Sequence, residues 1–176
     1  MLTQNKKKAM EIATYLERMN QKRRQLDSDV FTSSSQMVDT SDHYHDQSVL
    51  VLGDFNWHAG VIGIAASKLV NMYSKPVVVI GIDEKIARGS ARTIGDVNIY
   101  QLLKQCEHLF LSFGGHKQAA GFSLKPDLFN TFKQTLEEVS KSVPKESLYD
   151  SINIDMKLDS SDISFQLLDD LACMAP

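Results

Sequence analysis

The sequence predicts an α/β fold with a mixed sheet that contains a βαβ unit, is flanked by helices and follows a long N-terminal helix. The βαβ unit is indicated by an apolar run at residues 48–53, apolar residues at helical spacing over 61–72, and a second apolar run at 77–82. The short connections between these segments favour a parallel pair of strands with a crossover helix. The long helix is indicated by residues 4–25, which lack glycine and proline and place apolar residues three and four apart.

A polar segment at residues 27–46 separates this helix, at 1–26, from the βαβ unit. It is rich in serine, aspartate, threonine and glutamine and shows no sustained periodicity, so it is predicted to be a linker or a long loop. Residues 42–46 within it, Asp-His-Tyr-His-Asp, carry side chains that can bind a metal ion. The polar surroundings and the lack of a further clustered ligand favour a solvated loop over a metal site.

The rest of the chain alternates strands and helices. Strands are predicted at 85–93, 121–125 and 152–156, and helices at 98–108, 126–139 and 163–171. The sequence Ser160-Ser161-Asp162 before the last helix offers capping side chains.

Composition describes an ordinary globular chain of 176 residues with 43% hydrophobic and 23% charged residues. We find no run of about 18 apolar residues, which a membrane span needs, and two widely spaced cysteines fit a reducing cytoplasm. Residues 50–126 carry eight Lys or Arg against five Asp or Glu, and residues 127–176 carry four against ten. A polyanion is therefore expected at the central block, although this surplus of positive charge does not by itself establish nucleic-acid binding.

The stretch Gly114–Leu124 is predicted to form a loop, a tight turn and a strand. Gly114 and Gly115 let a ligand approach the main chain, His116 supplies a switchable donor and Lys117 a fixed positive charge. This combination suits an anion such as a phosphate. The alternative is a packed glycine-rich turn with a structural histidine.

Three polar side chains share one face of the strand predicted at 85–93. Arg88, Ser90 and Arg92 alternate along it, and arginine can bind two phosphate oxygens at once, so they form a candidate phosphate site. His58 follows the first strand of the βαβ unit, at the sheet edge where ligands gather in α/β folds. The alternatives are an exposed strand face with ordinary charges, and a capping or rim histidine.

Three blocks of the sequence resemble the bacterial RecJ single-strand-specific exonucleases. Residues 56–69 resemble the family's W-H-x-G-V-I-G-I-x-A-S-R/K-L block. Residues 89–93 match its G-S-x-R-S/T block, and residues 114–124 match its G-G-H-x-x-A-A-G-F-S-L block, which occurs in looser form across the DHH phosphoesterase superfamily. The order and approximate spacing of the blocks also fit.

The resemblance implies a domain organisation for this chain. Residues 1–26 correspond to a connecting helix, 47–148 to an α/β substrate-binding domain, and 149–176 to the start of an OB-fold-associated segment. Manganese or magnesium ions would be held by a preceding domain with a D-H-H signature, which this chain does not carry. We therefore expect no metal ligands and no catalytic residues here, and an inactive chain in isolation.

The function implied is 5′–3′ exonuclease action on single-stranded DNA in repair and recombination. Ser90 and Arg92 would hold phosphate, while His58 and His116 would face the metal site. Expected partners are single-stranded DNA, the DHH domain packed against 47–148, and a single-strand-binding protein or a helicase; no membrane is expected. The alternatives are a related phosphoesterase acting on short oligonucleotides or nucleotides, and a free-standing nucleic-acid-binding module.

Overall fold

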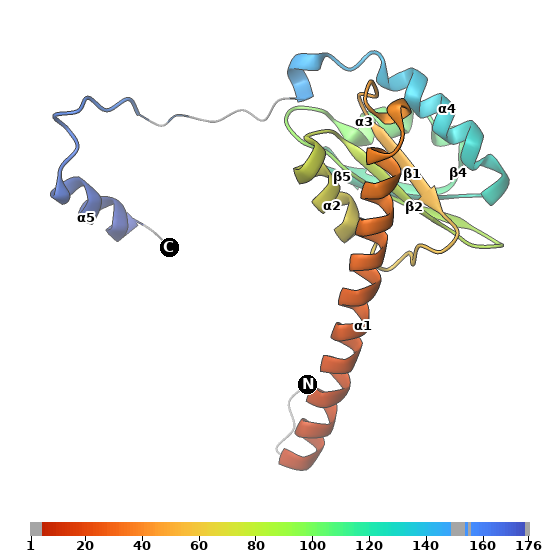
Figure 1. The fold of residues 1–176 in the computed structure, drawn as a ribbon, viewed down its shortest axis with the longest axis horizontal. Helices are drawn as coiled ribbons and strands as arrows, with labels where there is room; N and C mark the ends of the chain where they lie inside the picture. The colour runs from red at the N-terminus through yellow and green to blue at the C-terminus, as the bar shows by residue number, and fades with distance from the viewer. Residues whose placement is uncertain (1–4, 149–153, 155, 175–176) are drawn as a thin grey trace.

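A five-stranded mixed sheet forms the centre of the fold (Figure 1). The computed structural model describes residues 5–148, 154 and 156–174. The strands are β1 (Leu50–Asp54), β2 (Val77–Ile82), β3 (Ala87–Arg92), β4 (Phe110–His116) and β5 (Ala119–Leu124). Their order is β1-β2-β3-β5-β4, with β1 and β2 parallel and the other pairs antiparallel. The predicted mixed α/β sheet with a βαβ unit is confirmed.

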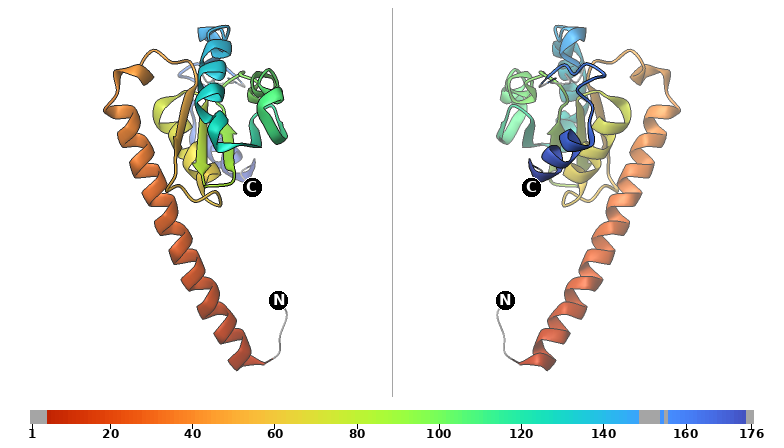
Figure 2. Two further views of the ribbon diagram at one scale, coloured as in Figure 1. Left: turned by 90° about the vertical axis from the view of Figure 1, so that its right-hand side faces the viewer. Right: turned by 90° about the vertical axis from the view of Figure 1, so that its left-hand side faces the viewer.

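Helices cover the sheet unequally on its two faces. The α-helices are α1 (Lys6–Asp39), α2 (Ile62–Tyr73), α3 (Ile99–Lys104), α4 (Phe129–Ser140) and α5 (Phe165–Met174). Short 3₁₀ helices span Asp42–Tyr44, Glu107–Leu109, Pro126–Leu128 and Lys145–Leu148. One buried cluster joins the sheet to α3 and α4, and the other joins β1 and β2 to α2 and α1. Figure 2 shows α1 and α4 on opposite sides of the sheet. Strands β1 and β2 are therefore buried on both sides, which explains their continuous apolar runs.

The long helix α1 extends further than predicted. It continues to Asp39, so the prediction of a linker over 27–46 is wrong for residues 27–39. The inward-facing residues of this part are Asp27, Val30, Ser34 and Val38, which are spaced three and four apart. Because two of these four positions are polar, the spacing of apolar residues alone does not reveal the helical period.

The segment that was predicted to be a solvated loop, residues 42–46, contacts the domain through the side chains of His43 and Tyr44. Tyr44 is buried, and Lys133 on α4 donates to its hydroxyl at 3.1 Å while lying 4.8 Å from its ring centroid. His43 Nε2 lies 3.0 Å from Glu137 Oε1. Asp42, His43, His45 and Asp46 are nevertheless exposed, so the solvated-loop interpretation holds for these four residues and is wrong for Tyr44.

A buried carboxylate fastens α1 to α2. Asp27 is 6% exposed, and its Oδ2 accepts a hydrogen bond from Lys68 Nζ at 2.6 Å. Because the Lys68 side chain is partly exposed, its ammonium group is stabilised partly by solvent and not by Asp27 alone. Loss of the lysine would nevertheless leave the carboxylate buried without a charged partner.

We therefore expect Lys68→Met to destabilise the fold by about 1–3 kcal/mol, a value reduced for the partial exposure of the lysine. Lys22→Met, on an exposed part of the same long helix, serves as the control and is expected to change stability by less than about 0.5 kcal/mol. Chemical denaturation measures both. Equal midpoints for the two variants would show that the ion pair does not fasten α1.

The glycine-rich stretch differs in its local structure from the prediction. Gly114, Gly115 and His116 are the last residues of β4, and the turn consists of Lys117 and Gln118, because His116 pairs with Ala119. The strand was predicted only from residue 121, but β5 begins at Ala119. The small side chains of this stretch thus form a hairpin and not a loop before a turn.

Helix α5 lies in the region where the last helix was predicted. Ser164 Oγ accepts from Leu167 N at 3.2 Å, so Ser164 caps the helix in place of Ser160–Asp162. The strand predicted at 152–156 falls largely outside the described residues, and of its apolar positions Ile154 and Met156 are exposed and not in a strand. Among the described helices, none combines the length and the apolarity that crossing a bilayer requires.

Candidate functional site

The sheet face beside α2 carries three rows of small and polar side chains. Strands β3, β5 and β4 are paired there in a register that places residues of like position side by side. The rows are Arg88–Ser123–Ser112, Ser90–Gly121–Gly114 and Arg92–Ala119–His116. No described helix packs over β5 and β4 on this side, since these residues offer little apolar surface to bury.

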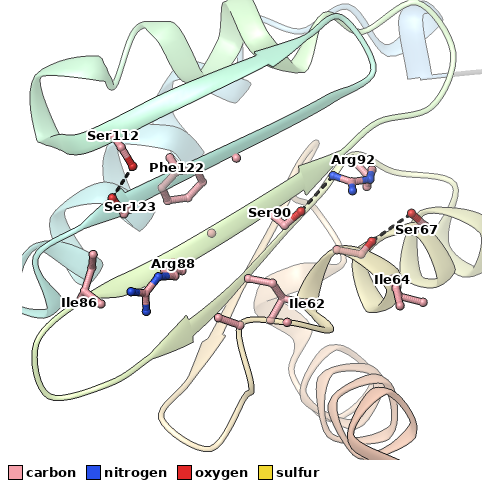
Figure 3. A pocket seen from close by; sticks show the side chains of 15 residues that line it. Ile62, Ile64, Ser67, Ile86, Arg88, Ser90, Arg92, Ser112, Phe122 and Ser123 are labelled. Atoms are coloured by element: carbon pink, nitrogen blue, oxygen red, sulfur yellow. Dashed lines mark hydrogen bonds between the residues drawn. The ribbon is translucent and has the colours of Figure 1, made fainter. Parts of the chain in front are cut away.

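An open groove of about 900 Å³ lies between this face and the N-terminal part of α2 (Figure 3). Its polar lining consists of two arginines and several serines, and no acidic side chain is found among the described residues that line it. Its walls come from α2, β3, β5 and β4, which brings together parts of the chain that lie far apart in sequence. An anion fits this lining better than a cation does.

Arg92 and Ser90 are hydrogen-bonded to each other in the groove. Arg92 Nη1 donates to Ser90 Oγ at 3.0 Å and to the Ala91 carbonyl at 2.8 Å, which fixes the guanidinium in place. A Cβ atom at Gly63 would lie 3.0 Å from both Arg92 Nη2 and Ser90 Oγ, so glycine lets α2 approach them closely. The remaining donors of the Arg92 fork have no partner among the described residues and are free to bind an anion.

Arg88 lies at the other end of the same strand face, tied to a neighbouring carboxylate. Its Nη1 is 3.3 Å from Asp83 Oδ2, and both side chains are about half exposed. The backbone N–H groups of Lys85 and Ile86 donate to Asp83 and, together with the nearby Arg88, lower the pKa of its carboxyl group. Asp83 therefore stays anionic and orients Arg88 while leaving the guanidinium accessible.

The two candidate histidines occupy hollows at opposite ends of the groove. His58 lines a hollow of about 540 Å³ that shares Arg88 with the groove, and its Nδ1 accepts from Gly60 N at 3.0 Å. His116 lines a hollow of about 470 Å³ that shares Arg92 with the groove. Both imidazoles are exposed, so the groove and its adjoining hollows form one extended track with a histidine at each end.

The hollow around His58 is anchored to the long helix. Trp57, next to His58, is buried and donates from Nε1 to Ser33 Oγ on α1 at 2.8 Å. Ser33 belongs to the part of α1 that was predicted to be a linker. The contact explains how a polar helix helps to position the segment that carries His58.

The remaining predicted residues lie apart from the groove lining. Lys117 Nζ is 2.9 Å from Asp96 Oδ1 at the surface of the hairpin turn. Gly115 has a φ of +153°, and an added Cβ would lie 2.5 Å from the Ala119 carbonyl oxygen, so packing within the hairpin explains this glycine. Gly114 has open space above it, since an added Cβ would meet no atom within 4 Å.

Two groove residues, Ser112 and Ser123, were not among the predicted site residues. Their hydroxyl oxygens are 2.6 Å apart across β4 and β5. The alternation of Phe122, Ser123 and Leu124 already places Ser123 on the polar face of its strand, so this residue was within reach of the sequence pattern. The position of Ser112 could not be predicted in this way, because a register shift between Phe110 and Ser112 interrupts the alternation on β4.

The described residues do not form a metal centre. No group of three or more His, Cys, Asp or Glu side chains lies close enough together to hold an ion in residues 5–148, 154 and 156–174. Within 42–46, His43 Nε2 contacts Glu137, and the side chains of Asp42, His45 and Asp46 are exposed. The side chains present thus do not fit a manganese or magnesium ion, and none of them is assigned to one.

Comparison with known proteins identifies the family. A model described as the DHHA1 domain matches residues 46–142. The single-stranded-DNA-specific exonuclease RecJ of Bacillus subtilis is 30% identical over 179 residues, covering 100% of this chain and 22% of the relative. The corresponding protein of Haemophilus influenzae is 28% identical over 174 residues, covering 94% of this chain and 30% of the relative. The chain thus spans less than a third of the length of these relatives.

Solved structures agree with this assignment. RecJ of Thermus thermophilus in complex with Mg²⁺ superposes with a TM-score of 0.71 at 29% identity, covering 81% of this chain and 22% of that chain. The same protein in complex with Mn²⁺ gives the same TM-score. Because the DHHA1 model matches more than half of the residues and the relatives share the fold, the chain belongs to the DHHA1 domain family and its resemblance to the RecJ exonucleases is confirmed.

Proposed function

We propose that this chain is the substrate-binding part of a single-stranded-DNA-specific 5′–3′ exonuclease acting in DNA repair and recombination. The observation that carries the proposal is the Arg92–Ser90 pair, held in an open groove without acidic side chains among its described lining residues. A guanidinium with free donors beside a hydroxyl binds a phosphate oxygen pair well. Support also comes from the RecJ relatives, whose name specifies single-stranded DNA.

The proposed arrangement divides the chain into three parts. Helix α1 connects a DHH domain to the DHHA1 domain at 47–148, and residues 149–176 begin an OB-fold-associated segment. Divalent ions would be held by the DHH domain; RecJ structures solved with Mg²⁺ and Mn²⁺ support the use of divalent metal ions. The residues of the present chain bind and orient the strand, with His58 and His116 at the two ends of its track.

Binding of single-stranded DNA by this chain should be weak and depend on salt. We expect two to four phosphate contacts, because the groove and its ends offer few cationic groups. For single strands the slope of log K against log salt is about −0.7 per phosphate, so a slope between about −1.4 and −2.8 is expected.

Fluorescence anisotropy with a 5′-phosphorylated single-stranded oligonucleotide, repeated over a series of salt concentrations, measures this slope. Arg92→Ala provides a matched variant and should make the slope shallower by about 0.7. Tight binding that is insensitive to salt would contradict a phosphate-binding groove and would point to base stacking instead.

A further inference from the structure

The pair of serines across β4 and β5 has an unusual position. Ser123 is 7% exposed although no described helix packs over β5 on its side of the sheet. Ser112 lies beside it, with 2.6 Å between the two hydroxyl oxygens, and both side chains line the groove (Figure 3). Ser123 is therefore largely withdrawn from water, whereas Ser112 is exposed, and the pair borders an open space.

The hydrogen-bond donors of the Ser112–Ser123 pair are not all used. Each serine hydroxyl carries one hydrogen and two acceptor lone pairs. One hydrogen is used between the two oxygens, and the other has no acceptor among the described residues of the groove. A hydroxyl donor at the wall of an open groove is available to a ligand that accepts hydrogen bonds.

The positively charged side chain of Arg88 is next to this hydroxyl donor in the sheet. In the sheet register Arg88 is directly opposite Ser123, which is directly opposite Ser112. Side chains at directly opposed positions have Cβ atoms about 4.5–5.5 Å apart, so the guanidinium and the free hydroxyl can reach the same ligand. Asp83 keeps Arg88 near this position without burying it. The chemistry is that of an anion site with one charged and one neutral donor group.

This anion site is separate from the one at Arg92 and Ser90. Arg88 and Arg92 are four residues apart on β3, which corresponds to about 13 Å along the strand. Between them lies the row Ser90–Gly121–Gly114, whose two glycines leave the sheet surface flat. An extended nucleic-acid strand can span this distance in two nucleotide steps, with a phosphate at each end and the intervening nucleotide over the flat part.

We propose that Arg88, Ser123 and Ser112 form a second phosphate site, which binds an internal phosphodiester of the same strand whose 5′ end is held at Arg92 and Ser90. The proposal rests on the proposed function and adds a direction and a footprint to it. The strand then runs across the sheet face from the His116 end towards the His58 end. Affinity should increase with strand length until both sites are filled.

The test uses the 176-residue chain and two ligands, a 5′-phosphorylated mononucleotide and a 5′-phosphorylated hexanucleotide, titrated by NMR. The double variant Ser112→Ala/Ser123→Ala is expected to bind the hexanucleotide about tenfold more weakly and the mononucleotide as the unaltered chain does. Ser112→Thr/Ser123→Thr retains both hydroxyls and should recover most of the loss. Ser35→Ala, on α1 outside the groove, controls for loss of a hydroxyl and should change neither affinity.

The outcomes separate the two proposals. If the unaltered chain binds neither ligand, the proposed function is wrong. If it binds both, and the double variant binds the hexanucleotide equally well, the second site is wrong while the groove function stands. Equal weakening for both ligands, or a loss that follows a lower melting temperature, would mean that the serine pair only fastens β4 to β5.

Discussion

Arg92→Ala is expected to weaken the binding of 5′-phosphorylated single-stranded DNA about ten- to a hundredfold. A hydrogen bond to a charged group contributes about 1.5–3 kcal/mol, which corresponds to this range. Arg92 lines the groove with free donors, whereas Lys117 is paired with Asp96 on the surface of the hairpin turn. Lys117→Ala should therefore change the affinity much less.

A third variant, Arg92→Lys, tests the geometry of the fork. Lysine keeps the charge but offers a single point of attachment, so it should recover only part of the loss. Titrations of all three variants should use the same oligonucleotide, and their melting temperatures must match that of the unaltered chain. Equal and small effects for Arg92→Ala and Lys117→Ala would place the phosphate site elsewhere.

The secondary structure was predictable where the buried positions are occupied by apolar residues. The runs at β1 and β2 are buried on both faces, so their sequence alone indicates a parallel pair with a crossover helix. The second half of α1 was missed for the opposite reason, because its buried face includes Asp27 and Ser34. An ion pair to Lys68 makes the carboxylate tolerable inside, and sequence periodicity does not reveal such a tertiary contact.

The candidate site was predictable in part. Alternation on one strand places Arg88, Ser90 and Arg92 on a common face, and the structure brings all three to the groove. What the alternation could not show is that β5 and β4 extend this face with Ser123 and Ser112, because that depends on the pairing register of separate strands. The sequence also did not show that Lys117 is paired with a carboxylate, because its partner Asp96 lies twenty-one positions away along the chain.

Gly114 and Gly115 are adjacent glycines, but the structure explains the need for glycine at only one of these positions. Both were predicted to bring the backbone close to a ligand. In the structure Gly115 has a backbone conformation that side-chain-bearing residues rarely adopt, and the space at its Cβ position is filled by the backbone of β5. Gly114 has neither constraint.

Gly115→Ala should therefore destabilise the fold by about 2–4 kcal/mol. The new methyl group would lie 2.5 Å from both the Ala119 carbonyl oxygen and the Ala120 Cα atom, and these backbone atoms cannot move aside without disturbing the hairpin. Gly114→Ala is the matched control, because its methyl group meets no atom within 4 Å and alanine is no worse than glycine in a strand. Thermal and chemical denaturation should show a loss for Gly115→Ala alone; equal stability of the two variants would show that the hairpin tolerates a side chain at residue 115.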